Sequence, residues 1–172
     1  MLDCLTDYIG LSSSVRTSES GLYLDAFPGI NLFNILKIAD EHSIEKVYED
    51  VQRRSIAKFR TFFITEFNRC FKLYKREAVD CLICENKELL AIALWYLTGA
   101  ELCEEFLRSD RINRYTGVDR KSVKENKDNL TDAFFSELAT SIAGIDIESS
   151  TCFEEGDNPE CNSSVTFVQV CP

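Results

Sequence analysis

The sequence predicts a mainly α protein: a helical bundle built on one long amphipathic helix, with an extended N-terminal arm and a short β-prone C-terminal tail. Between Ser43 and Tyr74, apolar residues recur at steps of three and four, the spacing of one buried stripe on a helix. Residues 89–97 are all apolar, as in a helix buried on most sides. After Gly144 the composition becomes acidic and β-branched. The expected domains are an arm over 1–30, a bundle over 31–145 and a tail over 146–172.

The first 30 residues are expected to lie outside the bundle. Residues 1–11 can form a short helix or an extended arm, and the serine-rich stretch 12–20 is typical of a linker. Residues 21–30 alternate weakly and include a Pro-Gly turn, so we expect extended chain there. Apolar side chains on such an arm need a partner. The predicted assembly contacts of the arm are Leu22, Tyr23, Leu24 and Phe27.

The long helix is predicted to start at Ser43, whose hydroxyl can cap it. Lys58 and Arg69 fall near its apolar face, so the stripe must drift or the helix must break near residues 52–55. One long helix is the favoured interpretation, and two shorter helices are the alternative. Asn31 can cap a short preceding helix over residues 32–39.

Two further helices follow a polar connection at residues 72–80. Asn86 can cap a helix that runs to about Arg108, and Trp95 is expected to be buried in it because almost no polar face surrounds it. Ser122 and Glu125 have the spacing of a capping box, which opens a helix that ends at Gly144.

The tail is predicted to form a hairpin, or a single strand that pairs with another chain, because Val165–Val170 is rich in β-branched residues. Its predicted assembly contacts are Val165, Phe167 and Val168. We expect residues 146–172 to be dispensable for folding of the bundle and needed for assembly.

Composition excludes several classes of function. The 172 residues are expected to form one domain, and the formal charge of −10 argues against a general nucleic-acid-binding surface. A single histidine removes most histidine-based catalytic and metal sites. The N-terminus lacks the pattern of a signal peptide, and the longest apolar run is far shorter than the roughly 20 residues of a membrane span. These features predict a soluble protein made in a cytoplasm.

The eight cysteines are many for that compartment, where most of them should be reduced. Cys81 and Cys84 form a C-x-x-C motif and are weak candidates for zinc ligands, together with two of Cys152, Cys161 and Cys171. Ordinary thiols are the favoured interpretation; zinc and disulfides are the alternatives. Cys4, Cys70 and Cys103 are expected to be small core residues.

No catalytic pattern stands out in the sequence. It contains no phosphate-binding loop, no G-x-G-x-x-G and no G-x-S-x-G motif. The lone His42 is expected at a helix end rather than as a general base. The chain is therefore predicted not to be an enzyme and to need no cofactor.

The N-terminal third resembles a family of phage proteins in three distinctive stretches: residues 4–11 (CLTDYIGL), then 20–25 (SGLYLD) with 28–30 (PGI), then 51–54 (VQRR). This pattern is similar to that of neck proteins of crAss-like and related Bacteroides-infecting tailed phages. The resemblance covers roughly residues 4–70 well and the later helices loosely, and it carries no catalytic signature.

The resemblance implies a structural virion protein, a head–tail connector or adaptor that forms a ring of about twelve copies in the neck. Such a ring would extend or seal the DNA channel, bind the portal and neighbouring tail components, and let DNA pass without sequence-specific binding. Assembly would take place in the host cytoplasm, and no membrane would be involved. The alternative function is a zinc-stabilised helical interaction module that uses Cys81 and Cys84.

Overall fold

The computed structural model describes residues 2–9, 15–18, 21–24, 27–31, 41–70, 76–108, 120–147 and 149–153. In chain order these residues form η1 (Asp3–Tyr8), β1 (Val15–Ser18), β2 (Gly21–Leu24), β3 (Phe27–Asn31), α3 (Glu41–Cys70), α4 (Arg76–Glu85), α5 (Lys87–Arg108), α6 (Arg120–Ala143) and η3 (Thr151–Phe153). The predicted mainly α class is confirmed.

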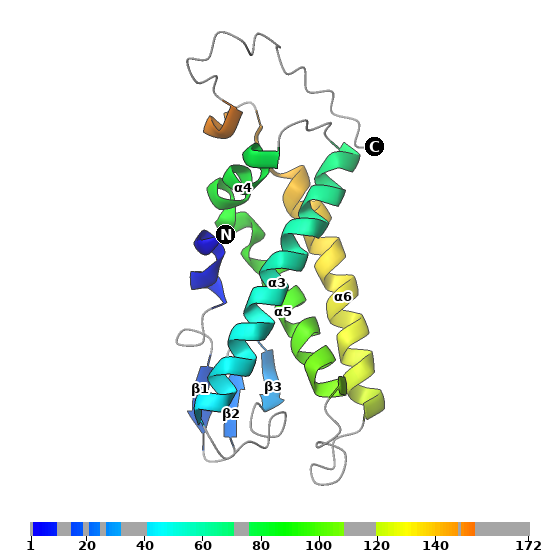
Figure 1. The fold of residues 1–172 in the computed structure, drawn as a ribbon. Helices are drawn as coiled ribbons and strands as arrows, with labels where there is room; N and C mark the ends of the chain where they lie inside the picture. The colour runs from blue at the N-terminus through cyan, green and yellow to red at the C-terminus, as the bar shows by residue number, and fades with distance from the viewer. Residues whose placement is uncertain are drawn as a thin grey trace.

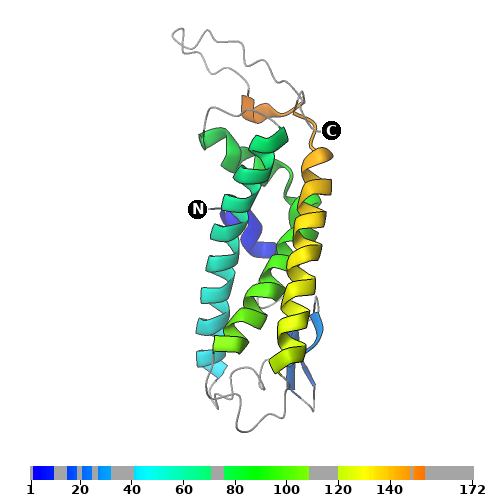
Figure 2. The ribbon, with the colours of Figure 1, turned by 90° about the vertical axis from the view of Figure 1, so that its right-hand side faces the viewer.

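The three long helices α3, α5 and α6 lie side by side, and α5 contacts both of the others (Figures 1 and 2). The short helix α4 lies at one end, while the strands lie at the opposite end (Figure 1). η1 packs beside α5. Every one of these helical elements contributes to a single core. Its fully buried side chains include Leu5, Ile9, Phe59, Phe63, Phe67, Leu82, Ile83, Leu90, Leu94, Phe134, Leu138 and Ile142.

Helix α3 is continuous over 30 residues, which confirms the favoured prediction of one long helix. Phe59, Phe63 and Phe67 follow one another at steps of four, and their ring centroids are 6.4 Å and 5.5 Å apart. Lys58, which the stripe places close to this face, forms an ion pair with Glu101 of α5. A basic side chain near the apolar face is therefore tolerated because an acidic partner meets it.

Helix α4 corrects the prediction of a connection at residues 72–80. The helix begins at Arg76, and Val79, Leu82 and Ile83 are its buried residues. Asn86, which was predicted to cap the next helix, lies between the end of α4 at Glu85 and the start of α5 at Lys87. The Asn86 carbonyl accepts from the Leu90 amide at 3.1 Å, which opens α5, and its side-chain amide donates to the Leu82 carbonyl at 3.0 Å, which closes α4.

Helix α6 begins at Arg120, two residues before the predicted cap, so exposed Ser122 lies inside the first turn. Gly144 follows the last residue of α6 as predicted, and its amide donates to the carbonyls of Thr140 and Ser141. The chain then stays in contact with the core. Ile145 and Ile147 are buried in it, so the packed part of the protein extends past the predicted boundary at 145/146.

The three strands form an antiparallel sheet in the order β1-β2-β3, with β2 in the centre. Val15 pairs with Leu24 and Ser18 with Gly21, so part of the predicted linker 12–20 is a strand. Asn31, the predicted cap of a short helix, ends β3. Residues 32–39, where that helix is expected, lie outside the described residues, as do His42's side chain and residues 154–172.

Candidate functional site

Three apolar side chains form an exposed row on α5, which we call the outer stripe: Leu89, Ile92 and Trp95. They are 42%, 45% and 37% exposed. The spacing of three residues keeps them on one side of the helix. The prediction that Trp95 is buried was therefore wrong. When a helix is apolar on all sides, its sequence does not indicate which side faces outward.

The outer stripe is bordered by η1 and by the end of α6. The Trp95 indole Nε1 donates to the Tyr8 carbonyl at 2.7 Å, a contact between residues 87 positions apart. At the other end of the stripe, the Ser141 hydroxyl donates to the Leu89 carbonyl at 3.0 Å. The shape of this surface therefore depends on η1 as well as on α5.

A second apolar surface is a groove between α3, α5 and α6, with a volume of about 490 Å³. We call it the interhelical groove. One wall of the groove is an aromatic cluster. The centroid of the Phe135 ring lies 5.2 Å from that of Phe62 and 4.9 Å from that of Phe134. Phe134 is fully buried, whereas Phe135 is 44% exposed at the edge. The remaining lining residues are Ala57, Lys58, Thr61, Leu97, Ala100, Glu101, Glu104, Arg108, Lys127 and Thr131.

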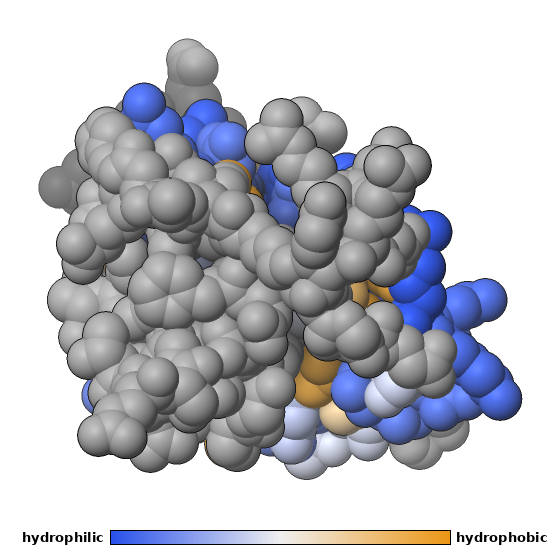
Figure 3. Space-filling view, turned by 90° about the horizontal axis from the view of Figure 1, so that it is seen from below, coloured by the Kyte–Doolittle hydropathy of each residue, from blue (hydrophilic) through white to orange (hydrophobic). Residues whose placement is uncertain are grey.

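Charged side chains at the groove are paired between helices. Glu104 of α5 binds Lys127 of α6 and also Arg108, whose Nε lies 3.2 Å away. The hydrogen bond from Lys127, together with the charges of Lys127 and Arg108, holds the pKa of Glu104 below its usual value. In the view from below, the described residues that can be seen are mostly hydrophilic, and a few hydrophobic residues are visible among them (Figure 3).

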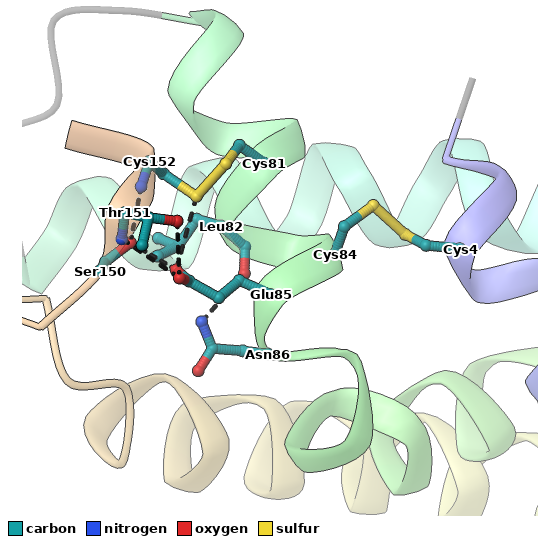
Figure 4. Close-up of a disulfide and its surroundings, with 9 residues drawn as sticks. All are labelled: Cys4, Cys81, Leu82, Cys84, Glu85, Asn86, Ser150, Thr151 and Cys152. Atoms are coloured by element: carbon teal, nitrogen blue, oxygen red, sulfur yellow. Dashed lines mark hydrogen bonds between the residues drawn. A yellow bond between two sulfur atoms is a disulfide. The ribbon is translucent and has the colours of Figure 1, made fainter. Parts of the chain in front are cut away.

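Two disulfides correct the expectation that the cysteines are mostly reduced. Cys4 of η1 is bonded to Cys84, and Cys81 is bonded to Cys152, with Cα–Cα distances of 5.6 Å and 5.7 Å. Both pairs start on α4 and leave it in different directions (Figure 4). Cys4 was expected to be a separate core residue, but it packs against the core as half of a disulfide.

The C-x-x-C sulfurs are thus placed in two separate bonds and do not converge on one metal. A zinc-stabilised module would require both Cys81 and Cys84 as free thiolates. Among the described residues, no group of three or more His, Cys, Asp or Glu side chains is placed to hold a metal ion. Cys103 is free and buried, and desolvation raises the pKa of its thiol to about 11.

Glu85 binds the chain next to Cys152 (Figure 4). Its carboxylate accepts from the Ser150 hydroxyl and from the Thr151 amide and hydroxyl, the last two at 3.1 Å. The hydrogen bond from Ser150, followed by that from the Thr151 amide, lowers the pKa of Glu85. Residues 150–152 are therefore held to α4 by a disulfide and by an ionised carboxylate together.

The structure places only part of the predicted assembly contacts. Leu22, Tyr23 and Leu24 lie in the central strand β2, and Phe27 lies in the edge strand β3, where Leu24 is its partner. Val165, Phe167 and Val168 lie outside the described residues. Neither the outer stripe nor the interhelical groove was predicted from the sequence. The spacing of residues 89, 92 and 95 was the one signal for the stripe, but the apolar neighbours obscured it.

Comparison with protein families, with curated proteins and with solved structures finds no match for this chain. Within the described part of the chain, no helix has both the length and the apolar character of a membrane span.

Proposed function

We propose that this protein is a structural subunit that assembles head to tail into a ring in the neck of a tailed phage. The observation that carries the proposal is the presence of two unlike apolar surfaces on different sides of α5, the outer stripe and the interhelical groove. A symmetric dimer uses one surface twice, whereas a ring requires two different surfaces that fit each other.

The two surfaces are separated both around and along α5. The stripe residues lie in its N-terminal half, and the groove residues of α5 run from Leu97, in the middle of the helix, to Arg108 at its C-terminal end. At 3.6 residues per turn, the centres of the two sets point about 135° apart, and at 1.5 Å per residue they are on the order of 15 Å apart along the axis. One copy can therefore offer its stripe to a second copy while its own groove accepts a third.

The chemistry of the two surfaces supports this pairing. Leu89, Ile92 and Trp95 are partly exposed apolar side chains, and the groove offers Phe135 at its edge beside Phe62. Full burial of an exposed side chain of this size is worth roughly 1.5–3 kcal/mol, so covering the roughly 40% that is still exposed would contribute about 0.6–1.2 kcal/mol for each residue. The bases at the groove are already paired with Glu101 and Glu104 of the same copy, so the contact would rest on its apolar side chains.

The assignment to a phage neck rests on the resemblance of residues 4–11, 20–25, 28–30 and 51–54. Two features support it. Virion surfaces are among the oxidising environments in which disulfides persist. The formal charge of −10 on each subunit would keep passing DNA from binding to a ring of such subunits. In this role the ring extends or seals the DNA channel and binds the portal and tail components.

Mixing of two variants tests the head-to-tail pairing. Ile92→Glu blocks the stripe and Phe135→Glu blocks the groove; both positions are exposed, so each variant should fold. Each variant alone should stay monomeric by native mass spectrometry, and an equal mixture should form a dimer and nothing larger, because one intact pair of surfaces remains. Ala139→Glu, at an exposed position of α6, is the matched control and should assemble like the parent.

Two outcomes would contradict the proposal. If the mixture stays monomeric while the parent assembles, the stripe does not pair with the groove. If the parent itself is monomeric with portal and tail components supplied, it is not a ring subunit. The position in the neck is tested separately by antibody labelling of phage particles that carry this protein, where label at the head–tail junction is expected and label elsewhere would exclude the neck.

A further inference from the structure

Both disulfides of the described chain begin on the same stretch of α4 and hold segments from opposite ends of the sequence. Cys84 binds η1 through Cys4, and Cys81 binds the segment after α6 through Cys152 (Figure 4). We propose that they form a redox lock on the assembly surface. Oxidation fixes η1 and the segment around Cys152, which slows the dissociation of assembled subunits, and reduction lets these segments open more often. The effect on assembly rests on the function proposed above, whereas the release of the segments does not.

The link between the lock and the outer stripe is η1. Its last residue, Tyr8, and the following Ile9 are contacted by three side chains of other elements. The Tyr48 hydroxyl donates to the Ile9 carbonyl at 2.9 Å, the Gln52 amide donates to the same oxygen at 3.2 Å, and Trp95 of the stripe donates to the Tyr8 carbonyl. Displacement of η1 would leave the Trp95 indole without this acceptor and would change the edge of the stripe.

These contacts also show that η1 can stay in place without its disulfide. Leu2, Leu5 and Ile9 are 4%, 0% and 2% exposed, so η1 buries an apolar face in addition to its hydrogen bonds. The reduced protein should therefore keep the stripe intact most of the time and should still assemble. Without the disulfide, η1 would still detach from the bundle briefly, because a local segment opens at a far lower free energy than a whole domain unfolds. The Cys4–Cys84 bond would prevent this local opening.

The reaction is thiol–disulfide exchange with a dithiol reductant. An incoming thiolate attacks one sulfur of the bond, the other sulfur leaves as a thiolate and takes up a proton, and the second thiol of the reductant resolves the mixed disulfide. Each disulfide gains two electrons and two protons, and the reductant becomes a disulfide. Cys81 is exposed, whereas Cys4, Cys84 and Cys152 are half-buried against the core. Cys81–Cys152 should therefore be reduced first.

Glu85 gives the second bond a further property. The Cys152 Sγ lies 3.4 Å from Glu85 Oε2. After reduction, the Cys152 thiol can donate to this carboxylate, and the nearby negative charge opposes formation of the thiolate that must attack to restore the bond. Glu85 therefore acts on this pair in two ways: its charge disfavours the attacking thiolate, and its hydrogen bonds with Ser150 and Thr151 keep Cys152 close to Cys81. Cys4–Cys84 has no such contact among the described residues and serves as the internal reference.

The experiment compares oxidised protein, protein reduced with dithiothreitol and alkylated, and the double variants Cys4→Ser/Cys84→Ser and Cys81→Ser/Cys152→Ser. The control is Cys103→Ala, which removes a thiol that takes no part in a disulfide. Hydrogen exchange should show loss of protection at residues 3–9 when Cys4–Cys84 is absent, and at residues 145–152 when Cys81–Cys152 is absent. Circular dichroism should show that α3, α5 and α6 persist.

Dissociation of the assembly after dilution is then followed in each state. Faster dissociation of the Cys4→Ser/Cys84→Ser variant than of Cys103→Ala is expected. Equal protection of residues 3–9 in oxidised and reduced protein would overturn the lock, and so would equal dissociation rates in an assembly that forms. Failure to assemble in either redox state would instead refute the proposed ring, while the exchange data would still decide whether the segments are released.

Discussion

Phe134 and Phe135 are neighbours on α6, but of the two only Phe134 is fully buried, and its ring centroid lies 6.2 Å from that of Phe59 and 5.5 Å from that of Phe62. We expect Phe134→Ala to lower the free energy of unfolding by about 3–5 kcal/mol, as other Phe-to-Ala changes in cores do. Phe135→Ala, at a position 44% exposed, should cost clearly less. Urea unfolding of both variants measures the difference. Equal losses would mean that the aromatic cluster is packed differently.

Glu85 leads to a prediction about pH. Its pKa is lowered in the folded protein, mainly by the hydrogen bond from Ser150, so the contribution of this carboxylate to stability is complete above its unfolded pKa of about 4.3. That contribution is lost as the pH falls through the lower, folded pKa. The parent should therefore lose more stability between about pH 5 and pH 3 than Glu85→Gln does. Urea midpoints across this range test it, and parallel curves would contradict it.

Several residue-level features could not be read from the sequence. Cysteine connectivity depends on which side chains the fold brings together, and four cysteines alone allow three pairings. The expectation of reduced thiols came from the expected compartment and not from geometry, so it missed the bonds of Cys81 and Cys84. The ion pair between Lys58 and Glu101 could not be predicted from the sequence either, although the position of Lys58 near the apolar face of the helix was predicted.

At the level of elements, helical periodicity predicted α3, α5 and α6 well because each presents a long apolar face. It failed for α4, where Val79, Leu82 and Ile83 are the buried hydrophobic residues among the side chains described, and where four of the seven residues at 72–78 are charged. Strand β1 was not predicted for a related reason. Its four residues are too few to show the alternation of a strand, and the residues around them are rich in serine.

The outer stripe of α5 contains the single tryptophan of the chain, which makes it a reporter. In the monomer, Trp95 is 37% exposed and its fluorescence should be accessible to a polar quencher. If the stripe docks in the groove of another copy, assembly should lower the quenching constant and shift the emission to the blue. An assembled protein whose quenching matches that of the monomeric Ile92→Glu variant would show that the stripe is not part of the interface.

The segment after α6 revises the expected effect of truncation. Removal of everything after Gly144 deletes Ile145, Ile147 and the disulfide partner Cys152. Two buried isoleucines alone are worth roughly 3–6 kcal/mol, so this truncation should destabilise the protein. Truncation after Phe153 keeps all three residues and is the matched control. Thermal melting of both, followed at the helical signal, should show a clear loss for the shorter chain only. Equal melting would mean that this segment adds nothing to the core.

For the whole molecule, the formal charge of −10 opposes assembly, because every added copy is negative. Salt screens this repulsion over a Debye length of about 10 Å at 0.1 M. Apolar contacts do not weaken with salt, so association of the parent should strengthen as sodium chloride is raised. Sedimentation velocity at low and high salt tests this. Weaker association at high salt would indicate that ion pairs, and not the stripe and groove, hold the assembly.

The arrangement of the two disulfides also determines how the chain carries mechanical tension. Cys4 is linked to Cys84 across 80 positions and Cys81 to Cys152 across 71, and the two loops overlap at residues 81–84. A pull on the two ends would pass from Cys4 to Cys84, through one turn of α4, and out from Cys81 to Cys152. The three long helices would lie off the loaded path. At roughly 3.3–3.6 Å per extended residue, the two loops contain chain that could extend to a length on the order of 500 Å. This chain cannot extend until a sulfur–sulfur bond is broken.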